Sequence, residues 1–408
     1  MTANDPTSND ADPAQPRAAV RARFAGRRLR LGTRRSALAM AQSAMIADRL
    51  RAEVGCAVDL VPIVTSGDRS SAEISQIGGT GVFVSALRDA LRDGEIDFAV
   101  HSLKDLPTAT PAGLVLAAVP RREDPRDVVV SPSGRRLAEL GRGALVATGA
   151  PRRAAQLHAM GLGLDVVAIR GNVDTRIKKA IDGEVDAVVL AYAGLARLDR
   201  LDAVTEVLAP EAMLPSPGQG ALAIECLDGR GLVVAGPARA LIGDVTHRDA
   251  APAGFQDMSE PESARPGSSS GQTWPDDGQP IDGALAELLR FVLDDASSSI
   301  AVRAERAFLA AIEAGCTAPV GALAEVEPAP VAGKGTAVAG PAAAGRVAAA
   351  GDASPAGRLR LRAVVAAPDG STVLRRDVTG SAVDPEALGK RLADDMLSAG
   401  AHSLMGTS

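Results

Sequence analysis

Aromatic residues are scarce in this chain of 408 residues: one Trp, one Tyr and six Phe make up 2% of it. Single-stranded nucleic-acid binders and many sugar-binding sites rely on aromatic side chains as stacking platforms. The formal net charge of -6 also leaves no overall basic field that would attract DNA. We therefore expect no nucleic-acid partner.

Cysteine is scarce as well, with only Cys56, Cys226 and Cys316 in the whole sequence. An odd, sparse set of this kind is typical of a reduced, cytoplasmic protein. No apolar run approaches the length that spans a membrane, so we expect no membrane partner. Residues 1–23 are polar and lack the apolar stretch of a signal peptide. We expect residues 1–27 to form a disordered N-terminal tail.

Several catalytic signatures are missing too. The histidines and cysteines show no spacing typical of metal ligands, so we expect no metal. The sequence contains no Gly-x-Ser-x-Gly elbow, no P-loop and no dinucleotide-binding fingerprint. The chemistry must therefore come from other residue types.

Arginine-bearing turns are the main positive feature of the sequence. Three times, a strand-like run ends near a glycine and a helix then opens with arginine in or beside its first turn, at residues 30–36, 146–153 and 169–176. The unpaired N–H groups and the positive dipole end of a helix N-terminus bind anions, and arginine strengthens such a site. Three of these turns predict a ligand with several negative charges.

The arginines of these turns are the candidate anion-binding residues. A single arginine is usually a solvated surface charge, but the recurrence of the pattern favours binding. The candidates are Arg34, Arg152, Arg153, Arg170 and Arg176, whereas Arg35, Lys178 and Lys179 could equally face solvent.

A second candidate feature is the segment His101-Ser-Leu-Lys-Asp-Leu-Pro107, which follows a buried strand. From spacing alone, Asp105 is most simply a helix N-cap or a surface ion-pair partner. In the alternative interpretation its carboxylate faces the arginine turns, whose charges lower its pKa and suit it to stabilising a cation. We expect His101 to be a buried structural residue rather than a catalytic one.

Cys316 lies in a third segment, just after a predicted helix and before a predicted strand. A lone cysteine is usually a small buried apolar residue. The alternative is a covalent attachment point on a loop.

The hydrophobic pattern up to residue 228 alternates strands with helices. The predicted strands are 28–32, 58–64, 96–100, 114–119, 128–130, 145–148, 166–169, 187–190 and 221–226. This alternation implies α/β layers of the parallel type, with ligands at the carboxyl ends of the strands. The C-terminal third differs: a helix at 299–314, a strand at 320–326, a hairpin at 359–378 and a helix from Pro385 predict an α+β unit.

Taken in order, these segments resemble the hydroxymethylbilane synthase (porphobilinogen deaminase) family. The matching segments are 31–39, 101–107, 151–157, 170–176, 187–198, 217–225, 305–309 and 315–322. The resemblance covers about residues 28–228 and 293–326, and more loosely the closing hairpin and helix. It implies an α/β fold of two lobes resembling type II periplasmic binding proteins, plus a small C-terminal α+β domain.

The resemblance also suggests domain boundaries. We expect domain 1 at 28–123 and 219–228, domain 2 at 124–218, a mostly irregular insertion or linker at 229–292, and domain 3 at 293–408 with a low-complexity insertion at about 327–357.

The activity implied by the resemblance is that of a transferase in porphyrin (haem) biosynthesis. Such enzymes join four porphobilinogen molecules head to tail into the linear tetrapyrrole hydroxymethylbilane and release ammonia at each addition. A dipyrromethane cofactor, held through a thioether, primes the chain, and the matching cysteine is Cys316. Each pyrrole carries an acetate and a propionate, which explains the arginine turns of an acidic protein. The expected partner is this small-molecule substrate, and we expect a monomer.

Residue roles follow from the same resemblance. Asp105 matches the aspartate that stabilises the cationic azafulvene and relays protons. The cofactor-binding matches are Lys104, Arg152, Arg153, Arg176, Thr148 and Gly149, and the substrate-binding matches are Arg34, Ser36, Arg170, Arg197 and Gln219. Thr80 and Ser85 stand where many family members have lysine, so a contact made by those lysines is in question.

A non-catalytic binding protein with the same two lobes is the alternative function. Secreted solute binders normally carry a signal sequence, and they need no third domain with a cysteine.

Overall fold

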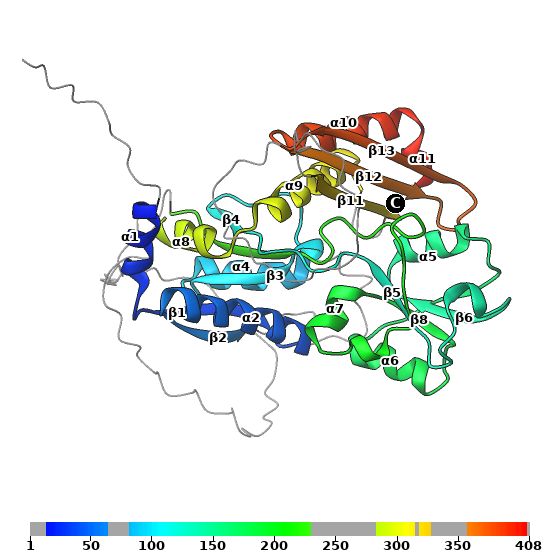
Figure 1. Cartoon of the computed structure of the whole chain (residues 1–408), viewed down its shortest axis with the longest axis horizontal. Helices are drawn as coiled ribbons and strands as arrows, with labels where there is room; N and C mark the ends of the chain where they lie inside the picture. Colours follow the sequence, from blue (N-terminus) through cyan, green and yellow to red (C-terminus); the bar gives the residue numbers. More distant parts are fainter. Residues whose placement is uncertain (1–13, 64–80, 230–282, 315–317, 328–356, 406–408) are drawn as a thin grey trace, which may run out of the picture.

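The computed structural model describes residues 14–63, 81–229, 283–314, 318–327 and 357–405. Three sheets organise it, each the centre of its own hydrophobic core (Figure 1). We refer to the units built on them as the first lobe, the second lobe and the C-terminal domain. The mixed α/β class expected from the sequence, with two lobes and a small C-terminal sheet domain, is confirmed.

The first lobe is built on a five-stranded sheet of order β2-β1-β3-β10-β4. Its strands are β1 (Arg28–Arg34), β2 (Ala57–Ile63), β3 (Phe98–Ser102), β4 (Leu114–Ala118) and β10 (Leu222–Leu227). Strand β1 runs parallel to β2 and β3, whereas β10 is antiparallel to β3 and β4. The helices α2 (Ala37–Val54), α4 (Gly81–Arg92) and α8 (Ala284–Leu293) pack against this sheet.

The second lobe has a five-stranded sheet of order β7-β6-β8-β5-β9. Its strands are β5 (Asp127–Val130), β6 (Leu145–Thr148), β7 (Asp165–Ala168), β8 (Ala187–Ala191) and β9 (Glu206–Val207). Its helices are α5 (Pro151–Ala159), α6 (Val173–Ile181) and α7 (Tyr192–Arg197), and short 3-10 turns lie at Leu137–Glu139 and Leu201–Ala203. Strand β6 is parallel to β7 and β8, and β5 is antiparallel to β8 and β9.

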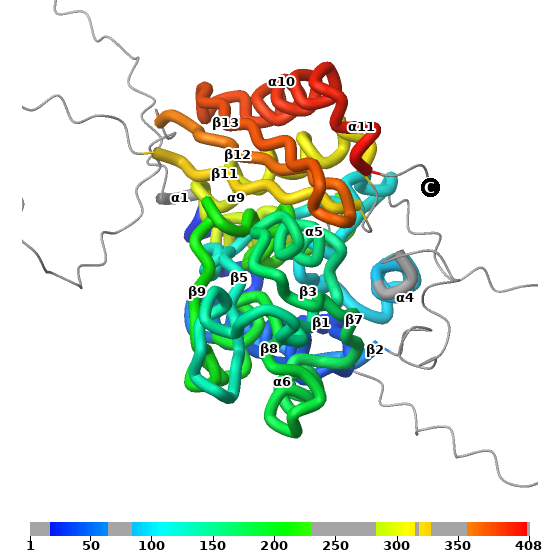
Figure 2. Tube along the Cα trace, turned by 90° about the vertical axis from the view of Figure 1, so that its right-hand side faces the viewer, coloured from blue at the N-terminus to red at the C-terminus, as the bar shows by residue number. Residues whose placement is uncertain are grey.

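The C-terminal domain is an antiparallel sheet of order β11-β12-β13 with helices on one face. Its strands are β11 (Val320–Glu327), β12 (Arg358–Ala366) and β13 (Val373–Ser381), and its helices are α9 (Ala296–Ala311), α10 (Pro385–Ser398) and α11 (Ala401–Leu404). Figure 2 shows this domain lying over both lobes. Helix α9 runs between the C-terminal sheet and the first lobe (Figure 1).

The chain crosses between the two lobes twice. The first crossing, residues 119–126, leads from β4 to β5, and the second, residues 208–221, leads from β9 to β10. We call these two segments the hinge crossings. Because they run close together, Glu123 N donates to Gly220 O across them at 3.2 Å.

The N-terminus differs from the tail expected over residues 1–27. Residues Ala14–Phe24 form helix α1, and residues 1–13 lie outside the described chain. Val20 and Phe24, four residues apart on one face, are buried in the first-lobe core together with Leu285 and Leu289 of α8. Burial of this small apolar face against another helix overrides the polar composition of the segment.

The stretch 229–292 ends in ordered structure. Residues 284–292 form most of helix α8, which is buried along nearly its whole length, while 230–282 lie outside the described chain. The low-complexity insertion expected at 327–357 also lies outside it, apart from its two end residues. Within the described ranges, no helix combines the length and the apolar character that a membrane span requires.

Candidate functional site

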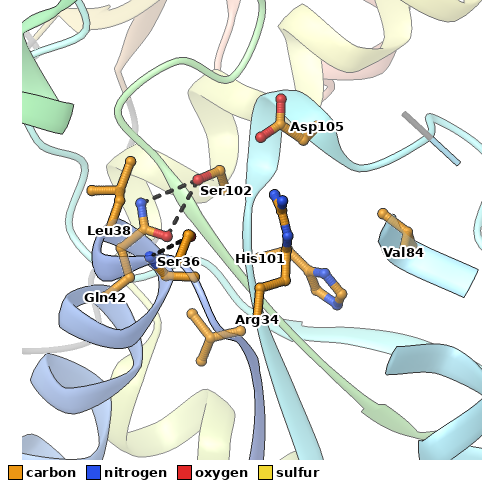
Figure 3. Close-up of a pocket in the computed structure, with 10 residues that line it drawn as sticks. Arg34, Ser36, Leu38, Gln42, Val84, His101, Ser102 and Asp105 are labelled. Carbon is orange, nitrogen blue, oxygen red and sulfur yellow. Dashed lines mark hydrogen bonds between the residues drawn. The ribbon is translucent and has the colours of Figure 1, made fainter. Parts of the chain in front are cut away.

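A first cavity lies in the first lobe, at the carboxyl ends of strands β1 and β3 (Figure 3). We call it the lobe cavity. It is lined by Arg34, Ser36, Leu38, Ala39, Gln42, Val84, Val100, His101, Ser102 and Asp105. Because β1 and β3 are adjacent and parallel, their carboxyl ends meet although they are far apart in sequence.

Local structure explains how each side chain reaches this cavity. Arg34 ends β1, and Ser36 caps α2 by accepting a hydrogen bond from Ala39 N at 3.3 Å. Asp105 ends a 3-10 turn, Leu103–Asp105, that follows β3 directly. In Figure 3 the guanidinium of Arg34 points toward the side of the cavity where the carboxylate of Asp105 lies. A cation and an anion therefore border one space.

Gln42 and Ser102 form the polar floor of the lobe cavity. The amide of Gln42 is buried, and its Nε2 donates to Ser102 Oγ at 3.1 Å. Sequence reasoning missed both residues. The available signal was a glutamine on the largely apolar buried face of α2.

A second cavity lies where the two lobes and the C-terminal domain meet, and we call it the hinge cavity. It is lined by Lys104, Asp105, Gly149, Ala150, Pro151, Arg152, Arg153, Arg176, Ser216, Pro217, Gln219, Leu309, Ala318 and Val320. Asp105 borders both cavities. One carboxylate thus faces the lobe cavity on one side and a strongly cationic space on the other.

Arg152 and Arg153 share one internal counter-ion, Asp127. Arg152 Nη1 lies 2.8 Å from Asp127 Oδ2, and Arg153 Nη2 donates to Asp127 Oδ1 at 2.8 Å. Gln219 Nε2 also donates to Asp127 Oδ1, at 2.7 Å. Burial alone would raise the pKa of Asp127, but the two guanidinium groups hold it at about 2. Asp127, which sequence reasoning missed, therefore neutralises part of the expected charge and fixes both arginines in place.

Lys104 contributes a second kind of cation to the hinge cavity. Burial lowers its pKa to about 8 from 10.5; the charge of Asp105 opposes this shift, whereas that of Arg153 adds to it. Its Nζ donates to Gln219 Oε1 at 3.5 Å. The charge of this side chain therefore changes close to neutral pH.

Arg176 reaches the hinge cavity through a gap that a glycine leaves. A Cβ on Gly149 would lie 2.8 Å from Ile169 O and 3.2 Å from Arg176 Nη2. Within the described chain, Arg176 Nε has no hydrogen-bond partner although it is buried. Burial and the nearby Arg153 lower the pKa of Arg176. This guanidinium is placed to bind an anion from the cavity.

The other predicted residues lie farther from the cavities. Thr148 is buried behind Gly149, where its Oγ1 accepts from Ala150 N at 3.3 Å. Arg197 donates to Gly220 O at 2.5 Å in the second hinge crossing, and Arg170 is exposed. None of these three is among the residues that line either cavity.

The cysteine segment cannot be placed directly, because Cys316 lies outside the described residues, as does Thr80. Of the described residues on either side of Cys316 in the sequence, Leu309 of α9, Ala318 and Val320 line the hinge cavity. Ser85, on α4, lines neither cavity.

His101 borders the lobe cavity but belongs to a buried ionic group. Its Nε2 lies 3.3 Å from Glu225 Oε2, and Arg88 Nη2 donates to Glu225 Oε1 at 2.8 Å. This pairing fits the structural role expected for His101. Among the described residues, no group of His, Cys, Asp and Glu side chains could hold a metal ion.

Residues 29–234 match the family model described as "Porphobilinogen deaminase, dipyromethane cofactor binding domain", and residues 299–333 match "Porphobilinogen deaminase, C-terminal domain". The chain is 46% identical over 386 residues to "Porphobilinogen deaminase 1" of Streptomyces coelicolor, covering 93% of this chain and 97% of that protein. It is 44% identical to "Porphobilinogen deaminase" of Nocardia farcinica, covering 93% and 88%.

A solved structure is more distantly similar. Substrate-binding domain 2 of GlnP from Lactococcus lactis, in its open conformation, aligns with 11% identity and a TM-score of 0.32, covering 50% of this chain and 83% of that one.

Proposed function

This chain belongs to the porphobilinogen deaminase family, and from that premise we propose how its own residues perform the family's reaction. The protein is a transferase that condenses four porphobilinogen molecules into hydroxymethylbilane with release of ammonia. A covalently bound dipyrromethane primes the reaction. The alternative of a non-catalytic binding protein with two lobes is therefore set aside.

The residues of the hinge cavity fit a dipyrromethane. Each of its pyrrole rings carries an acetate and a propionate, and the cavity offers Lys104 and Arg176 as cations beside the partly neutralised pair Arg152 and Arg153. Leu309, Ala318 and Val320 give the same cavity an apolar part that suits the faces of the rings. When bound, the group supplies the pyrrole carbon to which the first substrate is joined. We propose that Cys316, two residues before Ala318 in the sequence, holds it.

Asp105 is the proposed catalytic residue, and its position carries the proposal: its carboxylate borders both cavities. When porphobilinogen loses ammonia it leaves a cation, which a carboxylate facing both cavities can stabilise. The same carboxylate can then accept the proton released when the new bond forms. Arg34 and Ser36 would hold the carboxylates of the incoming substrate in the lobe cavity, with Gln42 and Ser102 as polar partners.

The remaining candidates are proposed in supporting roles. Gly149 and Thr148 shape the strand end that admits Arg176, and Gln219 orients Lys104 and Asp127. Arg170 and Arg197 stay candidates for contacts with longer intermediates, because Arg170 follows the end of β7, the strand next to β6, and Arg197 contacts the second hinge crossing. We propose that the protein works as a monomer in the cytoplasm, and its described cysteines, Cys56 and Cys226, are free thiols.

Intact-mass measurement tests the attachment site. The purified chain should carry the mass of a dipyrromethane, and Cys316→Ser should lack it. The matched control is Cys226→Ser, a buried cysteine of the first-lobe core, which should keep the adduct. An adduct that persists in Cys316→Ser would show that the proposed attachment site is wrong.

Turnover of Asp105→Asn tests the catalytic role. The substitution keeps the shape of the side chain and removes its charge. We expect turnover to fall at least about 100-fold, in the range seen when general acid–base catalysis is lost, while the cofactor mass stays unchanged. The matched control is Asp93→Asn, which removes the same charge from an exposed residue just after α4. Turnover of Asp105→Asn close to that of the control would rule the role out.

A further inference from the structure

Helix α9 presents one face to the turn that carries Asp105. Val302, Arg306 and Leu309 are spaced four and three residues apart, so they share that face. Val302 is buried in one cluster with Leu103 and Leu106, which flank Asp105. Leu309 borders the hinge cavity. Arg306 therefore lies between the packing contact and the cavity.

Arg306 donates hydrogen bonds to the backbone immediately after Asp105. Its Nη1 donates to Leu106 O at 3.0 Å, and its Nη2 donates to Pro107 O at 2.7 Å and to Thr108 O at 3.0 Å. Three consecutive carbonyl groups thus accept from a single guanidinium. Arginine suits this task because its donors have a fixed planar arrangement.

Other contacts fix the opposite end of the turn. Leu103 N donates to Ala221 O of the second hinge crossing, and Leu106 N donates to Leu103 O, both at 3.0 Å. The side chain of Leu103 packs over Gly218, where a Cβ would lie only 2.3 Å from Leu103 Cδ2. The chain just before Asp105 is therefore held by the second hinge crossing, and the chain just after it is held by α9.

The same helix lies just before Cys316 in the sequence. Helix α9 ends at Ala311, five residues before Cys316. A contact between α9 and the Asp105 turn therefore links the position of the carboxylate to the part of the C-terminal domain that borders the hinge cavity.

We propose that Arg306 is a positioning residue for the reaction: it holds the Asp105 turn in register with the C-terminal domain, so that the carboxylate faces the growing end of the chain. This inference rests on the roles proposed for Asp105 and Cys316. Arg306 itself lines neither cavity and is not assigned a contact with substrate.

The test compares Arg306→Gln and Arg306→Lys with Arg303→Gln. Arg303 lies on the same helix and makes only an exposed ion pair with Glu386, so it is a matched control. For Arg306→Gln we expect kcat to fall roughly 10- to 100-fold, since small misplacements of a catalytic group cost about that much. KM should change less than about threefold, because the lobe cavity is intact. Arg306→Lys, which keeps the charge but not the planar donor set, should recover part of kcat.

Two further readouts separate positioning from a merely structural role. The cofactor mass should remain fully loaded in both Arg306 variants, and partially elongated enzyme should accumulate during turnover and be visible by intact mass. If kcat of Arg306→Gln equals that of Arg303→Gln, or if kcat falls only in proportion to the loss of loaded, folded protein, the inference is overturned. If Arg306→Gln does not fold, Arg306→Lys, which keeps the positive charge, is compared with Arg303→Gln instead.

Turnover of Asp105→Asn, measured in parallel, separates a failure of the catalytic role of Asp105 from a failure of the positioning role of Arg306. Turnover retained in Asp105→Asn would remove the catalytic role proposed for Asp105, on which the inference about Arg306 rests. Turnover lost in Asp105→Asn but kept in both Arg306 variants would overturn only the positioning role.

Discussion

Arg122 and Glu305 form a buried two-point ion pair, with Nη1–Oε1 and Nη2–Oε2 distances of 2.7 and 3.0 Å. Arg122 belongs to the first hinge crossing and Glu305 to helix α9. The same carboxylate accepts from Gly218 N at 2.6 Å, in the second crossing, and from Ala324 N at 2.7 Å, in β11. One side chain thus joins both hinge crossings to the C-terminal domain.

Removing Glu305 should therefore be costly. In Glu305→Ala the guanidinium of Arg122 and two backbone N–H groups lose their acceptor in a buried place, and we expect a loss of about 3–5 kcal/mol in the free energy of unfolding. Glu386→Ala, which breaks only the exposed pair with Arg303, should cost less than about 1 kcal/mol. Urea denaturation of the cofactor-loaded proteins measures both. Equal losses in the two variants would contradict the assigned importance of Glu305.

Asp127 should control stability in acid. Its pKa in the folded protein, about 2, lies below the ordinary value of 3.8, so its contribution is present above pH 3.8 and is lost as pH falls from there toward 2. A shift of this size corresponds to roughly 2 kcal/mol. In Asp127→Asn the free energy of unfolding should be lower at neutral pH and should fall less steeply between about pH 4 and 2. The exposed Asp48, paired with Arg51, gives the control Asp48→Asn, whose acid profile should follow that of the unaltered protein.

Lys104 predicts a pH dependence of stability with the same sign as that of Asp127, but in the alkaline range. Its pKa in the folded protein is about 8 and its ordinary value is 10.5, so between these values the unfolded chain binds more protons and the Lys104 contribution to stability rises with pH. Function should change the other way, because a neutral Lys104 leaves the hinge cavity with less positive charge. We expect kcat/KM to decline above about pH 8. The part of this decline that comes from deprotonation of Lys104 should be absent from Lys104→Arg. Identical pH profiles for the two proteins would show that Lys104 does not titrate there.

The absence of a side chain at Gly370 should allow the C-terminal hairpin to pack closely against the second lobe. It has φ +73°, and a Cβ there would lie 2.4 Å from Ala159 N and 2.6 Å from His158 Cβ, at the end of the helix that carries Arg152 and Arg153. Gly134 has nearly the same φ, +71°, with nothing within 4 Å of the added Cβ. Gly134→Ala therefore measures the conformational cost alone, about 1–2 kcal/mol. Gly370→Ala should lower the free energy of unfolding clearly more, and an equal effect would show that the hairpin contact contributes nothing.

Much of the fold could be predicted from the sequence, because local signals were strong. The apolar runs that end at the arginine turns became β1, β6 and β7. Helix α1 was not expected, since its stability depends on packing Val20 and Phe24 against α8, a helix far away in the chain.

The site was predicted less completely, for a similar physical reason. The turns at Arg34 and Arg176 do reach the cavities, whereas the charges of Arg152 and Arg153 are partly neutralised by Asp127. The sequence around Asp127 shows an acid at the start of a buried strand, but not which bases it faces. Arg306 was missed because its acceptors are backbone carbonyl groups, which leave no trace in the side-chain pattern.

The shared position of Asp105 has a consequence for how the length of the product is controlled. With Asp105 as the catalytic residue that we propose, every addition would take place at the same spot, since this one acid borders both cavities, and the oligomer would be drawn back past it by one unit each time. The number of units added would then depend on the space for the oligomer and on how many carboxylates the cationic wall can accommodate, rather than on any change in the chemistry of the coupling step.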